Sequence, residues 1–435
     1  MKKIENKQSY KIINSQKIDV DVTYATLQKL TILQAEHGNM FAFKTSKDSL
    51  AYFINEPTLI KELLVKNHSN YKKGPGFERI EMLLGNGLIV SDGEIWRRSR
   101  RMIQPAFSRQ NVHKLIQQML ICSKNRELLW NKSIQSKTLI NITEEMSEFA
   151  LELILRSIFG PDYDHLNSQE EGNLFSFLSK DSNRDLSVVM KMRNLRSHLL
   201  TLIKKRKKDN HEQFDFLSMY LLAKDKSGKK FEDKELIDEI ITLIVAGYET
   251  SAGTLNWAWY LIANNPNIEK RIHAESSPIF SEKGNLIYES IINMQYTQQV
   301  LEETLRLYPP VWLFSRKSIN DDNLGQYDIP VHSDLYLSPY ILHRSREFWS
   351  NPEKFDPDRF DKTPKAEKNN NAFIPFSLGP RRCLGEYFSF LEMKIHLGYL
   401  INKFKIKKSH SEDPGLNLGI NLRSKNDIFL EFKPR

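Results

Sequence analysis

The sequence predicts a mainly α-helical protein that carries small β-sheets. Apolar residues recur at helical spacing through most of the region from about 56 to 310. Shorter, strand-like apolar pieces occur before residue 56 and again after Pro309. No internal repeat, proline-rich linker or low-complexity tract divides the 435 residues, so we expect a single domain spanning 1–435.

The expected elements follow one another along the chain. The first sixty residues contain a helix near 24–35 and two short strands at 39–43 and 50–54 that form a small sheet. A helix also follows Cys383, the segment 367–371 (EKNNN) is expected to be an exposed loop, and strands are expected at 312–319 and near 426–432. Further helices are predicted at 57–67, 94–103, 110–131, 143–158, 187–208, 232–263 and 296–307.

Composition and charge set limits on the class of protein. Hydrophobic residues make up 40% of the chain and charged residues 27%, which is typical of a globular protein. The chain has two cysteines, and one of them is the candidate metal ligand described below, so no disulfide framework is possible and a reducing compartment is expected. The N-terminal segment has no apolar core typical of a signal or anchor, and the longest suitable apolar run, 240–246, is shorter than the roughly 20 residues that span a bilayer. We therefore expect a cytoplasmic protein with no transmembrane segment.

The ten residues 376–385, which read FSLGPRRCLG, are the most informative part of the sequence. A cysteine thiolate is a strong ligand of haem iron and favours cleavage of the O–O bond. Gly379 and Gly385 permit tight turns and a close backbone approach, and the Arg381 guanidinium suits a carboxylate such as a haem propionate. Helical spacing after Gly385 places Cys383 near a helix N-terminus, which favours an anionic sulfur. The alternative is that a lone cysteine is a small buried apolar residue, and this is our interpretation of Cys122.

The spacing of this segment is FxxGxRxCxG, which closely resembles the signature of the cytochrome P450 family. The resemblance extends over nearly the whole chain. It implies the cytochrome P450 fold, a single triangular helix-rich domain with a long central helix over the haem. It also implies haem b as the cofactor, Cys383 as the iron ligand and Phe376 packed beside the ring. Because the haem domain accounts for the whole chain, no redox-partner domain is expected within it.

The helix expected at 232–263 contains the sequence AGYETS. The Thr250 hydroxyl can bond to a carbonyl one turn earlier and Gly247 weakens the helix, so a local kink is expected. By themselves these residues are compatible with a packing threonine and a surface glutamate. The family resemblance implies instead that Ala246 and Gly247 contact the haem, that Thr250 orients water and dioxygen, and that Glu249 supplies protons.

Glu303 and Arg306 stand three residues apart on an expected helix, where an ordinary ion pair is the simplest interpretation. The resemblance implies a network of this pair with Arg359 that holds the cysteine loop and takes no part in the chemistry. We expect a structural role for His343 as well.

Trp96 and Arg100 lie one turn apart in the segment EIWRRSRR, on one face of a helix. Such a basic helix commonly faces water. The resemblance implies that both residues donate to haem propionates and that Arg316 joins them.

Four further arginines suggest where electrons enter. With a net charge of +9, local positive charge favours docking of an acidic electron-transfer protein, a ferredoxin or flavodoxin, or of a reductase. The residues concerned are Arg97, Arg98, Arg101 and Arg382.

The leading hypothesis is a monomeric, bacterial haem-thiolate monooxygenase. Such an enzyme takes two electrons from a separate partner and inserts one atom of O2 into a C–H or C=C bond of an apolar substrate. The segment GNGLIVSDGEIWRRSRR resembles the branch of the family that includes fatty-acid hydroxylases, so a fatty acid, terpenoid or steroid is expected. The positions implied for the substrate pocket are Phe77, Met82, Leu83, Val311, Leu313 and Ile420.

Three alternatives stay open at this point. The first is a peroxygenase or a fatty-acid hydroperoxide-rearranging enzyme on the same fold, which the presence of Glu249 and Thr250 disfavours. The second is a haem-binding sensor or carrier without turnover, which would not need a proton relay. The third is a helical scaffold without haem, which would be colourless.

Overall fold

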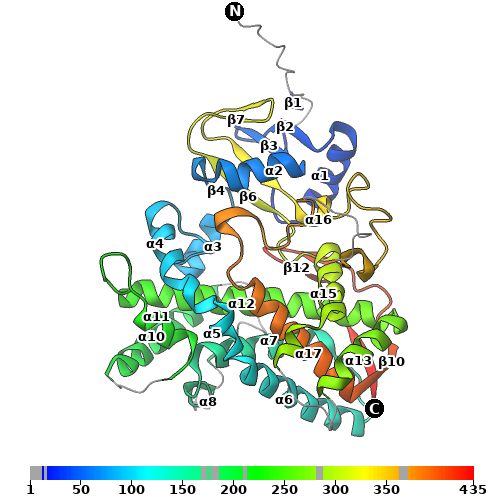
Figure 1. Ribbon diagram of the computed structural model, residues 1–435. Coiled ribbons are helices and arrows are strands. Elements are labelled where there is room, and N and C mark those ends of the chain that lie inside the picture. The colour runs from blue at the N-terminus through cyan, green and yellow to red at the C-terminus, as the bar shows by residue number, and fades with distance from the viewer. Residues whose placement is uncertain are drawn as a thin grey trace, which may run out of the picture. The chain divides into compact units, whose positions relative to one another are not determined.

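The computed structural model describes residues 12–13, 17–167, 174–175, 177, 186–208, 213–280, 288–361 and 371–435 (Figure 1). The chain forms two compact units. The first contains residues 1–78, 302–383 and 416–423, and the second contains 79–301, 384–415 and 424–435. The single-domain interpretation stays a prediction, and the loop expected at 367–371 lies outside the described residues except for Asn371.

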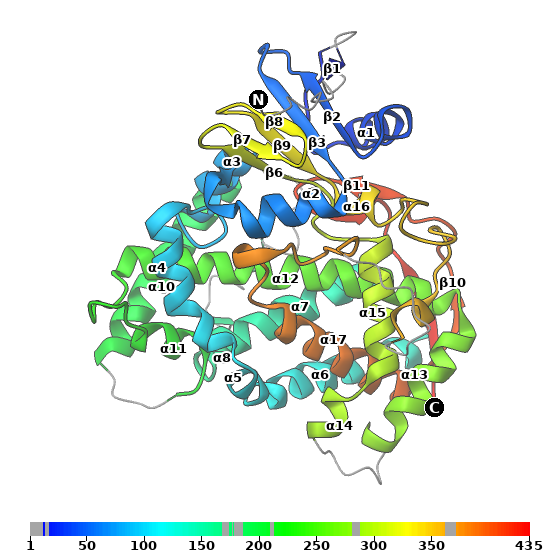
Figure 2. The ribbon, with the colours of Figure 1, turned by 45° about the horizontal axis from the view of Figure 1, so that its top comes forward.

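A mixed sheet is the centre of the first unit (Figure 2). β2 and β3 pair antiparallel with Met40 opposite Ile54, which confirms the small sheet expected from the sequence. β3 runs parallel to β9, and β9 pairs antiparallel with β6. In spatial order the strands are β1 (Ile12–Ile13), β2 (Met40–Lys44), β3 (Leu50–Ile54), β9 (Asp334–Leu337), β6 (Phe314–Ser318) and β4 (Tyr71–Lys73).

Short helices and two strand pairs complete the first unit. One face of the sheet packs into a core that includes Tyr52, Leu335 and Trp349, all buried. The strand pairs are β7 (Asp322–Leu324) with β8 (Tyr327–Ile329) and β11 (Leu416–Leu418) with β12 (Leu422–Ser424). The helical segments are α1 (Tyr24–His37), α2 (Pro57–Lys61), η1 (Glu62–Lys66), η2 (His68–Asn70), α16 (Pro339–Leu342), η4 (Pro357–Phe360) and η5 (Gly379–Arg381).

Helices form most of the second unit. The long helices expected at 143–158, 187–208 and 232–263 are confirmed, whereas the helix expected at 110–131 divides into Arg109–His113 and Ile116–Gln135. Two helices, α3 (Phe77–Leu84) and α15 (Gln295–Leu307), begin in one unit and end in the other. A small sheet of β10 (Phe404–Ser409), β13 (Phe429–Pro434) and β5 (Ile140–Asn141) completes the unit. Its helices are α4 (Gly93–Ile103), η3 (Gln104–Phe107), α5 (Arg109–His113), α6 (Ile116–Gln135), α7 (Ile142–Phe159), α8 (Asp162–Asn167), α10 (Leu186–Lys208), α11 (Phe216–Leu222), α12 (Asp233–Ala263), α13 (Pro266–Phe280), α14 (Tyr288–Ile292) and α17 (Glu386–Lys403).

The helix α12 is the longest in the described part of the chain. It begins with a capping box in which the side chains of Glu232 and Glu235 each bind the other's backbone N–H. It packs closely on α7, because a Cβ atom placed on Gly247 would lie 2.7 Å from Cδ1 of Ile154. Gly247 therefore has a packing function that the sequence motif did not reveal.

A buried acid joins α17 to α12. The Ser251 hydroxyl of α12 donates a hydrogen bond to Glu392 of α17, and both side chains are buried. Burial raises the pKa of Glu392 to about 8, and the bond from Ser251 opposes this only in part. The acid is therefore neutral in the folded protein at pH 7, whereas it is ionised when the chain unfolds.

Replacement of Glu392 by glutamine should flatten the dependence of stability on pH. Between pH 4.5 and about 8 the unfolded wild-type chain releases a proton that the folded chain retains. The free energy of unfolding should therefore fall with rising pH, at up to about 1.4 kcal/mol per pH unit from this group alone. Urea unfolding of wild type and Glu392→Gln at pH 5, 6, 7 and 8 measures the difference in slope.

The exposed Glu144 of α7 offers a matched control. Glu144→Gln makes the same chemical change at the surface and should keep the wild-type slope. Equal slopes for wild type and Glu392→Gln would contradict a buried neutral acid at this position.

Candidate functional site

The cysteine loop, residues 372–383, is held by its own main chain. The N–H of Ser377 donates to Ile374 O, and that of Cys383 donates to Phe376 O, each at 3.0 Å. Cys383 is exposed, whereas Cys122 is buried and burial raises its pKa well above the ordinary thiol value. α17 begins at Glu386, three residues after Cys383, as the sequence predicted. The loop thus presents an accessible sulfur just before a helix N-terminus, which favours its anionic form.

Gly379 has a conformation and an environment that only glycine accepts. Its φ is +71°, and a Cβ atom there would lie 2.0 Å from the carbonyl oxygen of Leu64. The loop backbone therefore lies directly against the segment η1. Gly385 differs from the expectation, because its φ of −80° is open to any residue.

A buried ion-pair network lies behind the loop. Arg306 donates from Nε to Glu303 Oε2 at 2.6 Å and from Nη2 to Glu303 Oε1 at 2.8 Å. Arg359 Nε donates to the same Oε1 at 3.2 Å, so the three-residue network expected from the sequence is present. Its function in holding the loop stays a prediction.

His343 connects this network to the cysteine loop. Its Nε2 accepts the N–H of Ile374 at 2.9 Å, so the proton of the neutral ring is on Nδ1, which donates to Arg306 O at 3.2 Å. Burial and the nearby Arg306 charge lower the pKa of His343 to about 3, which keeps the ring neutral. His343 is thus a fixed structural bridge between α15 and the residue two positions before Phe376.

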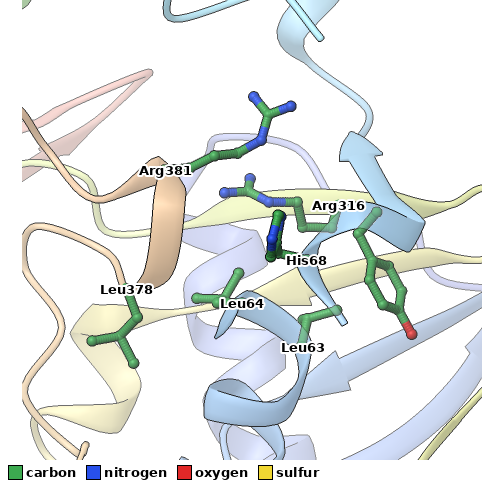
Figure 3. Close-up of a pocket in the computed structure, with 7 residues that line it drawn as sticks. Leu63, Leu64, His68, Arg316, Leu378 and Arg381 are labelled. Carbon is green, nitrogen blue, oxygen red and sulfur yellow. The ribbon is translucent and has the colours of Figure 1, made fainter. Parts of the chain in front are cut away.

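A basic recess lies beside the loop within the first unit (Figure 3). Figure 3 shows the guanidinium group of Arg316 beside the ring of His68 and that of Arg381 farther out, with leucine side chains on the other side. None of the seven described lining residues is acidic: Leu63, Leu64, His68, Tyr71, Arg316, Leu378 and Arg381. The recess suits a carboxylate at the edge of an apolar group. The sequence did not single out His68, since a histidine outside any motif carries no signal.

Within the second unit, α12 has a face that carries several small side chains. Along α12, residues 243, 246, 250 and 253 are half-buried while most neighbours are buried, and their spacing puts them on one face. The Thr250 hydroxyl donates to Ala246 O at 2.8 Å, as predicted from the sequence. Glu249 lies on the buried side of the helix. Ala246, Thr250 and Gly253 give this face of α12 small side chains.

The helix α4 carries the expected pair of Trp96 and Arg100, and Trp96 is buried. Arg98 differs from the expectation that it faces a docking partner. Its Nε donates to Asp225 at 2.7 Å and its Nη1 to Glu235 at 2.8 Å. Arg98 therefore holds the turn before α12 and is not available for docking.

The side chains expected around a substrate differ in exposure. Met82 is 86% exposed and Val311 is 37% exposed. Phe77, Leu83, Leu313 and Ile420 are half-buried.

Comparison with known proteins identifies the family. The model of the cytochrome P450 family matches residues 18–179 and 172–429. Cyclooctatin synthase of Streptomyces melanosporofaciens is 29% identical, over 88% of this chain and 85% of its own length. Pentalenene oxygenase of Streptomyces avermitilis is 27% identical, over 85% of this chain and 84% of its own length. The crystal structure of the cytochrome P450DA haem domain superimposes with a TM-score of 0.84 at 21% identity, covering 95% of this chain and 93% of that one.

The chain belongs to the cytochrome P450 family. It is a monooxygenase of apolar substrates, it has the cytochrome P450 fold, and its cofactor is haem b. The residues present fit this cofactor, because the first unit combines an accessible cysteine sulfur with a basic recess lined on one side by leucines. Across the described helices, no segment has both the length and the apolar character needed to cross a membrane.

Replacement of Gly379 by alanine should disrupt the cysteine loop. The methyl group would collide with Leu64 O, and the left-handed backbone disfavours any side chain. We expect a loss of at least about 2 kcal/mol in the free energy of unfolding, together with a lower haem content after purification. Thermal unfolding and the ratio of haem to protein absorbance measure the two effects.

Gly419 provides the comparison within the same unit, since a Cβ there would have its nearest neighbour at 3.9 Å. Gly419→Ala should retain wild-type stability and haem content. Wild-type behaviour of Gly379→Ala would show that the loop does not lie against Leu64.

Proposed function

We propose that Cys383 is the thiolate ligand of the haem iron. The observation that carries this is the exposed sulfur at the end of a loop whose backbone is fixed by Gly379 and His343. When bound, haem with a thiolate ligand supplies the activation of O2 for insertion into an apolar substrate. The protein supplies a rigidly held sulfur, basic side chains that bind the haem propionates, and a path for protons.

The basic side chains hold the propionates in this proposal. Arg316 and Arg381 bind them from the first unit and Trp96 and Arg100 from α4, while His68 adds a further donor from the recess. Support comes from the convergence of three of these groups on one recess. By the family resemblance, Phe376 of the first unit and Ala246, Gly247 and Thr250 of the second would also contact the haem.

Thr250 and Glu249 deliver protons in this proposal: Thr250 positions a water molecule and Glu249 supplies protons. The hydroxyl of Thr250 donates to Ala246 O, so its oxygen has lone pairs free to accept a hydrogen bond from a water molecule and hold it in place. Glu249 replenishes protons from the buried side of α12. This pairing favours turnover over the sensor or carrier alternative.

Electrons come from a separate acidic protein. Arg101 is exposed on α4 and Arg382 is exposed next to Cys383, whereas Arg97 pairs with Glu94 and Arg98 is held internally. Among the arginines of α4, the docking proposal therefore rests on Arg101.

The haem ligand is tested by Cys383→Ser. The variant should lose the thiolate signature in the reduced, carbon-monoxide-bound spectrum, because a serine oxygen is a poor substitute for sulfur on iron. Cys122→Ser is the matched control and should keep the wild-type spectrum, since Cys122 is buried. A thiolate spectrum that survives in Cys383→Ser would refute the assignment.

We further propose a cyclic terpenoid as the substrate. Support comes from two relatives, named cyclooctat-9-en-7-ol 5-monooxygenase and pentalenene oxygenase, which are 29% and 27% identical to this chain. Titration with cyclic terpenes should shift the haem absorbance, because the ligand displaces water from iron, with a dissociation constant at least about tenfold lower than for fatty acids or steroids of similar size. Tighter binding of a fatty acid or a steroid would overturn the terpenoid proposal and leave the haem ligand unaffected.

A further inference from the structure

The segment that joins α3 to α4 lies unusually close to α12. A Cβ atom on Gly85, whose φ is +80°, would lie 2.2 Å from Asp238 Oδ1. A Cβ on Gly87 would lie 2.2 Å from Thr242 Oγ1. Glycine at both positions lets the main chain of residues 85–91, here called the clasp loop, reach two acids of α12.

Two buried carboxyl groups bind the main chain of the clasp loop. Asp238 Oδ2 accepts the N–H of Asn86 at 3.1 Å, and Glu239 Oε2 accepts the N–H of Leu88 at 2.9 Å. Asp238 is 4% exposed and Glu239 is 3% exposed. Removal of either acid would leave a buried N–H without its acceptor.

The same acids connect two further helices. Arg196 of α10 donates from Nη1 to Asp238 Oδ1 at 2.5 Å and from Nη2 to Leu84 O at 2.9 Å. Ser99 of α4, which lies between Trp96 and Arg100, is hydrogen bonded to Glu239. The clasp loop, α4, α10 and α12 thus meet at two adjacent acids.

Asp238 and Glu239 differ in their electrostatic surroundings. Asp238 pairs with the Arg196 guanidinium. Glu239 faces Asp238 and Glu235 on its own helix, Ser99 on α4 and Tyr220 on α11, and Glu235 is itself paired with Arg98. Burial raises the pKa of Glu239 to about 7, and its bonds to Leu88 and Ser99 offset only part of this effect.

We infer that Glu239 is a positioning residue which, in its neutral form, fastens the clasp loop and α4 to α12, and that its ionisation loosens both. The neutral acid satisfies every partner, because its carbonyl oxygen accepts the Leu88 N–H and its O–H donates to the Ser99 oxygen. The ionised acid keeps the Leu88 bond only by holding a charge away from water. Opening of the clasp loop hydrates that charge and so becomes more favourable.

Linkage fixes the direction and the pH range. In the open state the pKa of Glu239 returns toward its ordinary value of 4.5, whereas in the closed state it is about 7. The closed state therefore retains a proton that the open state releases. Opening should become more favourable by up to about tenfold per pH unit between pH 4.5 and 7, and should be constant above that range.

The consequence for ligand entry rests on the proposed function. The clasp loop leads from α3, with the pocket candidates Met82 and Leu83, to α4, with the cofactor contacts Trp96 and Arg100. A looser clasp loop should therefore admit an apolar ligand faster above pH 7 than at pH 5.

Hydrogen exchange of the haem-loaded protein tests the inference without any measurement of activity. Protection factors for peptides covering residues 85–91 remove the intrinsic effect of pH on exchange. In the wild type they should fall severalfold or more from pH 5 to pH 7 and then level off. Glu239→Gln, whose amide copies the neutral acid, should keep high protection throughout this range.

Glu235→Gln is the matched control on the same helix. Glutamine preserves the capping box at this position, so the wild-type pH dependence should persist. The inference is overturned if Glu239→Gln shows the wild-type pH dependence, or if the wild type shows none.

A second measurement covers the case in which Glu239→Gln does not fold. In the wild type, the infrared C=O stretch of one neutral carboxylic acid should be lost around pH 7, where protection levels off, whereas the stretch of Glu392 should persist to about pH 8. The inference is refuted if no acid band is lost near pH 7. Protection could follow this pattern while the association rate of a cyclic terpene does not change with pH. That result would support the role of Glu239 in the clasp loop and contradict the proposed pocket residues Met82 and Leu83.

Discussion

The structure behind the cysteine loop depends on one buried ion pair whose hydrogen-bonding groups are all satisfied. Two charges removed from water cost several kcal/mol each unless their geometry is complete. Arg306 meets this condition, because its five N–H groups reach Glu303 twice and the carbonyl oxygens of His343, Pro352 and Lys354. Glu303 in turn accepts from Asp356 N and from Arg359. Loss of one member would leave a buried charge without its partner, so these segments are held as one piece.

The need for a paired cation also explains why the buried acids Glu392 and Glu239 have raised pKa values. Glu303 lies between two guanidinium groups, whereas Glu392 has a serine hydroxyl and Glu239 has a backbone N–H and a serine. Hydrogen bonds from neutral donors stabilise a carboxylate less than a paired cation does. Desolvation therefore prevails at Glu392 and Glu239, and their pKa values rise. Burial alone does not decide the charge of an acid; the charge of its partners does.

Much of the fold and part of the site could be predicted from the sequence. Helical periodicity correctly located α7, α10 and α12, because these helices bury one face or most of their surface. α13 (Pro266–Phe280) was missed because its apolar spacing is interrupted by charged residues and by Pro278. The Glu303–Arg306 pair and the Thr250 hydrogen bond were predictable because both partners lie within motifs of fixed spacing, whereas the link to Arg359 was expected only from the family resemblance.

Contacts between a motif and a distant backbone could not be predicted. His343 was expected to be structural, yet nothing in the sequence shows that it binds Ile374 N, thirty-one residues away. Likewise Arg98 belongs to a basic run that suggests a solvent-facing surface, but Asp225 and Glu235 reach it only after folding. Pairing over such separations depends on tertiary packing, and a local pattern of residue types does not contain it.

Glycines occur in this enzyme where the main chain of one segment lies in direct contact with another element. Gly379 lets the cysteine loop lie against Leu64, and Gly87 lets the clasp loop lie against Thr242. In each case the neighbour is a fixed part of another element, so a side chain at the glycine would move a whole segment. The clasp loop differs from the cysteine loop in one respect, because the former is held by an acid that can change its charge and the latter by the neutral His343. A rigid sulfur and an adjustable segment over α12 can therefore coexist in one chain, since the first is tied to a group that does not titrate near pH 7 and the second to one that does.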